Sequence, residues 1–332
     1  MISPSISAVV PLHNEQMNLP ELLRRVSAVL DALPGGPHEM LFVDDGSSDG
    51  TLEMLEVAVK IDPRISVIAL SRNFGHQAAL SAALDHVSGD VIVILDGDLQ
   101  DPPETIAALV AKHNEGYDVV YALRTGRKEA LWLKLCFFVF YRLMASMAEM
   151  NLPLDAGDFG LMSKRVVEQL RGMPEHHRYL RGMRSWVGFR QIGIPVERSK
   201  RSAGESKYGL LKRLKFATDA IFSFSAIPIR ASALMGFVAI VLSVLFAVYA
   251  VIVKLVFHRS TEGFTALLVM MTFLSGAVLF FLGIIGEYVG RVYEEVKARP
   301  LYVIQRIMGR AATNRANSPE FGVRPDNSRG QE

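Results

Sequence analysis

Two short acidic segments carry the most distinctive chemistry in the sequence. The first, VDDGSSDGT, places Asp44 and Asp45 side by side directly after the apolar stretch EMLF. The second, VIVILDGDLQDPP, places Asp96 and Asp98 on either side of a glycine, again after an apolar run. Carboxylates that follow buried segments are costly unless they bind something, so both segments are candidate ligand sites.

The D-G-D segment suits a hard divalent cation. Asp96, Asp98 and the nearby Gln100 offer oxygen ligands on a tight loop. Mg²⁺ or Mn²⁺ held in this way usually keeps water and shares substrate phosphates. The alternative is that the aspartates only shape a turn before a helix that begins near Pro103. A second acidic loop at the same edge of the fold favours the metal interpretation.

Asp44 and Asp45 also admit two interpretations. They could be turn formers within DDGSSDG, and Asp49, just ahead of the next helix, is best interpreted as a helix cap. Two adjacent carboxylates are harder to explain in this way, because like charges packed together are unfavourable. As hydrogen-bond acceptors they could bind the base or the sugar of a nucleotide.

Several other kinds of site lack support in the sequence. No G-x-G-x-x-G segment follows the first apolar run and no Walker loop occurs, which argues against dinucleotide and P-loop sites. His176 and His177 are adjacent, so a regular helix cannot turn both toward one zinc ion. The single cysteine, Cys136, excludes an internal disulfide. A formal net charge of +2 argues neither for nor against nucleic acid, and no nucleic-acid partner is expected.

The elements that must position the acidic segments alternate in type up to about Tyr121. Five apolar runs, ISAVVPL, EMLFV, ISVIAL, VIVIL and DVVYA, are typical of strands, and stretches such as LPELLRRVSAVLDAL repeat apolar residues at helical spacing. This alternation predicts an α/β fold with a mainly parallel sheet covered on both faces. Ligands bind such sheets beyond the carboxyl ends of the strands, where both acidic segments lie.

The later part of the chain predicts membrane insertion. Residues 231–253 and 263–286 contain no charged side chain. Each run exceeds the ~20 residues that a helix needs to cross the hydrocarbon core. Two buried core helices are the alternative, but such helices seldom run this far without a polar face.

Lys and Arg residues cluster outside these two uncharged runs. Because such residues are retained on the cytoplasmic side, both termini are expected on the cytoplasmic side of the inner membrane. The start of the chain shows no cleaved signal peptide.

Two further segments are amphipathic. The segment at about 131–150 is interrupted by Lys134 and Arg142, which favours a helix lying in the membrane interface over a third span. The expected organisation is an α/β domain at 1–207 that includes this helix, a juxtamembrane amphipathic helix at 208–230, a two-helix transmembrane hairpin at 231–289, and a cytoplasmic segment at 290–332 that is disordered from about 311.

Taken together, several motifs resemble one known family. VVPLHNE, VDDGSSDGT, SRNFGHQAAL, DGDLQDPPE and GESKYG, followed by two apolar segments, resemble the family 2 glycosyltransferases that load a sugar onto polyprenyl phosphate. Within that family the chain is most similar to bactoprenol glucosyltransferases and dolichol-phosphate mannose synthases. The resemblance covers nearly the whole chain up to about Arg310. It implies a Rossmann-like GT-A fold for the α/β domain.

The resemblance also implies roles for individual residues. Donor-binding positions are Pro11, Glu15, Asp44 with its neighbour Asp45, Asp96, and, in a loop that closes over the diphosphate, Arg201, Ser206 and Lys207. The metal-and-diphosphate positions are Asp96, Asp98 and Gln100, with Asp98 the most direct ligand. The lipid-phosphate positions are Arg124, which follows the fifth expected strand, together with Arg127 and Lys134.

The implied reaction is a metal-dependent, inverting transfer of a sugar to undecaprenyl phosphate. UDP-linked glucose is the first choice of donor, and the product would supply surface glycan modification. A phosphate monoester has its second pKa near ~6, so the acceptor needs no strong base. Asp158 in DAGDFGL stands where a base would act, but it could instead position the acceptor or the sugar. A homo-oligomer, with a tetramer favoured, is also expected.

Two alternatives remain open. A processive polysaccharide synthase shares the first domain, but LRGMRSW departs from its Q-x-x-R-W motif and two spans are few for a polymer channel. The other alternative is an inactive membrane scaffold that binds a nucleotide sugar. The intact Asp96, Asp98 and Gln100 argue against such a scaffold.

Overall fold

The chain forms two compact units, which are considered separately. The computed structural model describes residues 4–125, 156–176, 178–197 and 263–310, with isolated positions between 229 and 252. The first unit comprises residues 1–135, 152–206 and 300–332, and the second comprises 136–151 and 207–299. Both acidic segments belong to the first unit.

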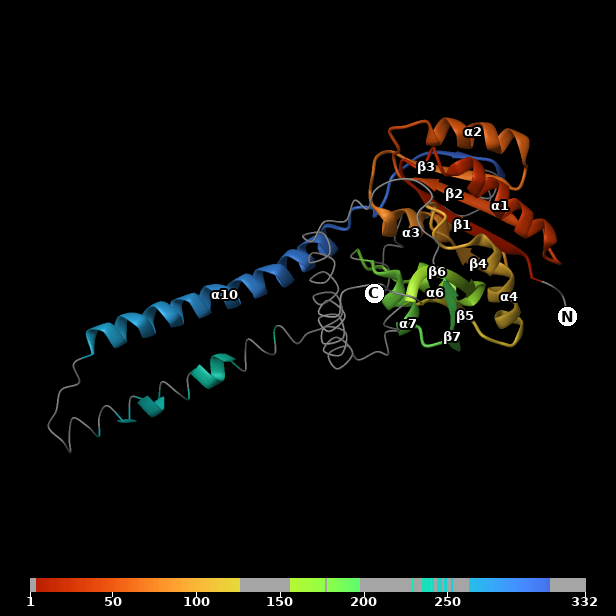
Figure 1. Cartoon of the computed structure of the whole chain (residues 1–332). Helices are drawn as coiled ribbons and strands as arrows, with labels where there is room; N and C mark the ends of the chain where they lie inside the picture. Colours follow the sequence, from red (N-terminus) through yellow and green to blue (C-terminus); the bar gives the residue numbers. More distant parts are fainter. Residues whose placement is uncertain are drawn as a thin grey trace, which may run out of the picture. The chain divides into compact units, whose positions relative to one another are not determined.

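The first unit is built on an eight-stranded sheet in the order β7-β5-β6-β4-β1-β2-β3-β8 (Figure 1). Strands β4, β1, β2 and β3 run parallel to one another. β6 is antiparallel to both of its neighbours, and β8 is antiparallel to β3. The strands are β1 Ile6–Leu12, β2 Glu39–Asp44, β3 Ile65–Leu70, β4 Val91–Ile94, β5 Val119–Thr125, β6 Ala156–Ser163, β7 Gln191–Glu197 and β8 Ile304–Met308.

The five strands predicted from apolar runs are all present, but the sheet is mixed. Three strands were not predicted: β7 runs parallel to β5, whereas β6 and β8 run against the others. β6 has the sequence AGDFGLMS, with two glycines and an aspartate, and these residue types are depleted in strands. β8 has only five residues, IQRIM, and follows a long helix. Its place in this sheet means that the predicted separate segment at 290–332 contributes to the α/β domain.

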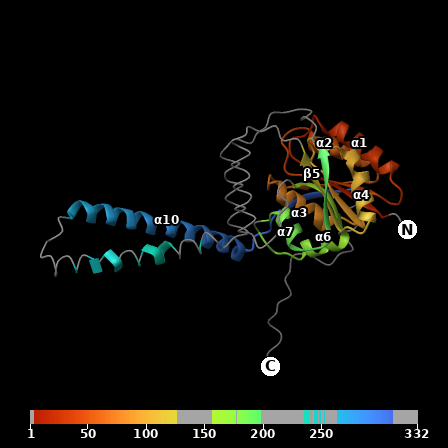
Figure 2. The ribbon, with the colours of Figure 1, turned by 60° about the horizontal axis from the view of Figure 1, so that its bottom comes forward.

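Helices cover both faces of the sheet, as predicted. One face packs against α1 Leu19–Ala32, α2 Thr51–Ile61 and α4 Ile106–Asn114, which follows the short 3-10 helix η1 Pro103–Thr105. The other face packs against α3 His76–His86, α6 Lys164–Arg171 and α7 Leu180–Trp186 (Figure 2). In α1, buried Leu19, Leu22, Val26 and Leu30 form the apolar stripe that the helical spacing predicted.

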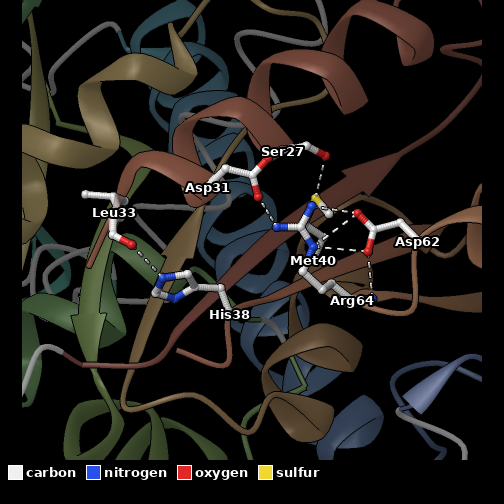
Figure 3. Close-up of polar contacts among 7 residues, drawn as sticks. All are labelled: Ser27, Asp31, Leu33, His38, Met40, Asp62 and Arg64. Atoms are coloured by element: carbon white, nitrogen blue, oxygen red, sulfur yellow. Dashed lines mark hydrogen bonds and ion pairs between the residues drawn. The ribbon is translucent and has the colours of Figure 1, made fainter. Parts of the chain in front are cut away.

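At the amino-terminal ends of the parallel strands, opposite the acidic loops, Arg64 links two helices (Figure 3). Its guanidinium donates to Asp62 at the end of α2 and to Asp31 in α1. Beside β2, Nδ1 of His38 accepts from the Ile6 N–H at 3.2 Å. These contacts fix α1, α2 and the starts of the strands relative to one another.

Helix α10, Phe264–Lys297, belongs to the second unit. Its 34 residues correspond to about 51 Å of helix, longer than the ~30 Å hydrocarbon core. Within the described residues it is the one helix long and apolar enough to cross a membrane, over Phe273–Lys297, which contains an 18-residue window with a mean hydropathy of 1.8. The predicted span at 263–286 begins at Gly263, the N-cap of α10, and continues within the helix. Only isolated positions of the predicted span at 231–253 are described, and residues 131–150, 208–228 and 311–332 lie outside the described residues.

The turn after β2 yields a test of the fold that positions the acidic pair. Gly46 has φ +61°, and a Cβ there would collide with the backbone of Arg72 and Asn73. Because both the left-handed backbone and the collision are unfavourable, we expect Gly46→Ala to lower the free energy of unfolding by about 2–5 kcal/mol. Thermal unfolding of the purified full chain measures this change. In the control, Gly172→Ala, the methyl group would lie 3.4 Å from the nearest atom, Gln169 O; equal shifts in the two variants would contradict the account.

Candidate active site

The two adjacent aspartates after β2 differ in their contacts. Asp44 is 1% exposed, and its Oδ2 accepts from the Ser47 N–H at 3.2 Å. Its Oδ1 is buried without a hydrogen-bond partner among the described residues. Burial raises the pKa of Asp44 despite the hydrogen bonds from Ser47. Asp44 thus offers one buried oxygen that can accept a hydrogen bond from a ligand.

Asp45 instead holds the loop that leads into α3. Its carboxylate accepts the Phe74 N–H at 2.7 Å and the Gly75 N–H at 2.9 Å. Its own N–H donates to the Leu12 carbonyl at 2.8 Å. Both carboxylate oxygens are therefore engaged by backbone amides, and Asp45 fixes the position of the first residue of α3, His76.

The end of β1 and the loop that follows it contact β2 and the start of α2. Pro11 pairs in register with Val43 of β2, and the Glu15 N–H donates to Thr51 Oγ1 at 3.0 Å. Asp49 accepts from the Thr51 N–H at 3.1 Å, which agrees with its predicted role at the start of α2. Pro11 is therefore one residue from Leu12, the register partner of Asp44, and Glu15 is held at the start of α2.

The D-G-D loop packs against this same segment. Asp96 and Asp98 follow β4 and are half-buried, and Asp98 Oδ1 accepts from the Gln100 N–H at 3.1 Å. A Cβ on Gly97 would collide with the Leu12 side chain and lie 3.7 Å from Glu15 Cγ. This close approach places the D-G-D loop beside the end of β1, and β1 pairs on its other side with β2, the strand that leads into Asp44 and Asp45.

The donor set fits a divalent cation that completes its shell with substrate oxygens and water. Asp96 and Asp98 supply carboxylate oxygens, the ligands that Mg²⁺ and Mn²⁺ prefer. Within residues 4–125, 156–176, 178–197 and 263–310, no three His, Cys, Asp or Glu side chains are grouped to hold a metal ion by themselves. The carboxylates therefore suit a shared metal rather than a closed protein cage.

Asp158 in β6 joins a charged cluster that the sequence did not predict. Arg181 of α7 donates from Nε to Oδ1 at 2.8 Å and from Nη2 to Oδ2 at 3.1 Å. His76 Nε2 lies 3.4 Å from Asp158 Oδ2 and 3.8 Å from Asp96 Oδ1. His76 thereby connects Asp158 to the D-G-D loop.

The cluster keeps the Asp158 carboxylate ionised. Burial by itself would raise its pKa, but the hydrogen bond from His76 and the charge of Arg181 outweigh burial and hold the pKa well below the usual range. Burial would lower the pKa of His76, yet Asp158 and Asp96 raise it. A carboxylate of such low basicity is a poor proton acceptor. The geometry favours the positioning alternative for Asp158 over the catalytic-base alternative.

His76 and Arg181 had weak signals in the sequence. His76 lies in the SRNFGHQAAL motif and Arg181 in the basic stretch RYLRGMR, but nothing local shows that they share a carboxylate. Their helices are tied together where the Leu180 N–H donates to Gln77 Oε1 at 2.9 Å. That contact aligns the first turns of α3 and α7.

The remaining predicted positions are only partly described. Arg124 lies inside β5 rather than after it, because the strand continues to Thr125. The Arg124 side chain and the other two predicted lipid-phosphate positions, 127 and 134, lie outside the described residues, as do the three predicted loop positions at 201, 206 and 207.

Comparisons with known proteins cover most of the chain. A family model described as glycosyl transferase family 2 matches residues 7–171. A Bacillus subtilis protein named uncharacterized glycosyltransferase YkcC is 42% identical, over 91% of this chain and 94% of its own. The SfII prophage-derived bactoprenol glucosyl transferase of Shigella flexneri is 37% identical, over 91% and 97%. The undecaprenyl-phosphate 4-deoxy-4-formamido-L-arabinose transferase of Klebsiella pneumoniae is 34% identical, over 93% and 95%.

The Asp158–Arg181 pair gives a second prediction. Asp158→Asn leaves Arg181 and His76 without their buried partner, so we expect it to lower the free energy of unfolding by about 3–5 kcal/mol. The double variant Asp158→Asn/Arg181→Met removes the unpaired cation as well and should be more stable than the sum of the single changes implies. Thermal unfolding of the four proteins completes the cycle; additive effects would show that the pair is not coupled.

Proposed function

The chain belongs to glycosyltransferase family 2 and is a glycosyltransferase, and we propose that it transfers a single sugar from a nucleotide sugar to a polyprenyl phosphate. The observation that carries the proposal is similarity over nine-tenths of the chain to proteins named for this kind of transfer. The acidic residues support it, since Asp44 has a buried oxygen without a partner among the described residues and the half-buried Asp96 and Asp98 offer carboxylate oxygens that suit a divalent cation.

The donor is proposed to span the two acidic loops. Asp44 Oδ1, buried and unpaired among the described residues, suits an N–H of the nucleobase, and Pro11 and Glu15 are proposed to contact the same nucleotide. Asp96 and Asp98, with Gln100, would hold Mg²⁺ or Mn²⁺ beside the diphosphate. The ion would neutralise charge that develops on the leaving group. Arg201, Ser206 and Lys207 are proposed to close over the diphosphate.

The acceptor phosphate is proposed to act without a strong base. Its second pKa of about 6 leaves it largely ionised at neutral pH. Arg124, Arg127 and Lys134 are proposed to bind it. Asp158 fixes Arg181 and His76 at the reacting edge instead of taking a proton. Direct attack by the phosphate oxygen on the anomeric carbon gives an inverted product.

Glucose from a UDP-linked donor is the first choice of sugar. The relatives are named for different sugars, glucose in one case and a formamido-arabinose in another. The sugar of this protein's donor must therefore be identified with a panel of nucleotide sugars. α10 is proposed to be one helix of a two-helix hairpin in the inner membrane, with the catalytic domain on the cytoplasmic side. The product would serve surface glycan modification. The enzyme is proposed to be a homo-oligomer, and a tetramer is the favoured state.

A transfer assay tests the proposal. Detergent-purified protein is incubated with Mg²⁺, undecaprenyl phosphate and a panel of radiolabelled nucleotide sugars, and label is counted in the organic phase. We expect label from one donor, which names the sugar. A polymeric product would favour the processive synthase, and folded protein that transfers nothing from any donor would favour the scaffold.

Loss of Asp98 tests the metal-binding loop. We expect Asp98→Ala to reduce transfer more than about 100-fold, since even residues that only support metal ligands contribute 10- to 100-fold. The variant should unfold at nearly the wild-type temperature. Asp31→Ala, which removes a carboxylate 61% exposed at the opposite edge, is the matched control. Substantial turnover by Asp98→Ala with Mg²⁺ present would argue against the metal role.

The anomeric configuration of the product tests the single displacement. An α-linked donor should give a β-linked sugar phosphate, because no covalent intermediate precedes attack. Proton NMR coupling constants of the purified lipid product report the configuration directly. Retention would require a double displacement and a nucleophilic side chain that the account lacks.

A further inference from the structure

Arg184 of α7 is a buried cation that the proposed reaction has not used. The residue is 4% exposed, and its Nε and Nη2 have no hydrogen-bond partner anywhere in the described ranges. Its guanidinium carbon lies 5.0 Å from the centre of the Tyr121 ring. Burial lowers its pKa to about 10, which still leaves it protonated at neutral pH.

No carboxylate among the described residues neutralises this charge. Asp158 attracts Arg184, but both of its oxygens already accept hydrogen bonds from Arg181. Arg181 and Arg184 are three residues apart on α7, so they lie on the same side of the helix. The region consequently presents two guanidinium groups to one buried carboxylate, and a buried ion without a partner is strongly unfavourable. An added anion would relieve this imbalance.

We propose that Arg184 is a phosphate-binding residue whose Nε and Nη2 donate to oxygens of a substrate phosphoryl group. The inference rests on the proposed function for the identity of that substrate. Adjacent Nε and Nη2 donors form the planar fork that matches two oxygens of a phosphate. The phosphoryl group belongs either to the polyprenyl phosphate or to the diphosphate of the donor, and both present the same chemistry.

The location of Arg184 is consistent with either phosphate. Asp158 is paired with Arg181 of α7. His76 Nε2 lies near both Asp158 and Asp96 of the D-G-D loop. A phosphate bound beside Arg181 and Arg184 would thus lie next to the proposed metal and diphosphate. The ring of Tyr121, which is in the same strand as Arg124, lies against the Arg184 guanidinium.

Binding measurements on the full chain in detergent test the inference. Arg184→Met is compared with Arg190→Met, which removes an exposed guanidinium that lies 4.9 Å from the Tyr117 ring centre. Affinities are measured by calorimetry for undecaprenyl phosphate and, separately, for UDP with Mg²⁺. We expect Arg184→Met to weaken one or both by roughly 10- to 100-fold, as for loss of hydrogen bonds to a charged group. Arg190→Met should change neither affinity.

The two probes distinguish the source of the phosphate. Weaker binding of undecaprenyl phosphate alone assigns Arg184 to the acceptor, and weaker binding of UDP alone assigns it to the donor. Unfolding temperature separates a binding role from a structural one, because removal of an unpaired buried charge should leave stability unchanged or raised. If Arg184→Met does not fold, Arg184→Lys keeps the charge but loses the fork, and it should bind about tenfold more weakly.

Two results would overturn the inference. One is wild-type affinity of the Arg184 variants for both probes, and the other is a wild-type protein that binds neither. The readout is independent of turnover. A protein that binds a phosphate through Arg184 but transfers no sugar would leave this inference standing while the proposed function fails.

Discussion

The charged part of the site depends on the pairing of Asp158 with Arg181. The carboxylate enters from β6, the one strand that runs against both of its neighbours in the middle of the sheet, and Arg181 enters from α7. His76 approaches from the first turn of α3 and also faces Asp96. One buried carboxylate thus fixes two helices and a loop at the reacting edge. Without it, the Arg181 guanidinium would lose its carboxylate partner and His76 would lose one of the two carboxylates that it faces.

The two aspartates after β2 contribute at different points of this arrangement. Asp45 holds the Phe74 and Gly75 amides, and so it sets where His76 enters the cluster. Asp44 keeps a buried oxygen directed to no protein partner in the described ranges. The first acidic segment therefore both supports the charged cluster and leaves one buried oxygen that can accept a hydrogen bond from a ligand. The second, around Asp98, lies against Leu12 and Glu15 and completes the same edge.

Sequence periodicity predicted five of the strands and the covering helices, and it placed both acidic segments after strands that prove to be parallel. It could not predict β6, β7 or β8, since glycines and an aspartate interrupt β6, a glycine and a proline interrupt β7, and β8 is a five-residue strand that follows α10 in the chain. The pairing of Asp158 with Arg181 and His76 joins elements far apart in the chain, so no local pattern reports it. The different roles of Asp44 and Asp45 follow from side chains that alternate between the faces of a strand.

We propose that the two acidic loops form two parts of one donor site. A structure of the full chain with a nucleotide sugar and Mn²⁺ would decide this. We expect the nucleobase to be hydrogen-bonded to Asp44 Oδ1, the metal to be bound to Asp98, and the diphosphate to lie between them. A nucleotide bound away from Asp44, or a metal that contacts neither Asp96 nor Asp98, would contradict it.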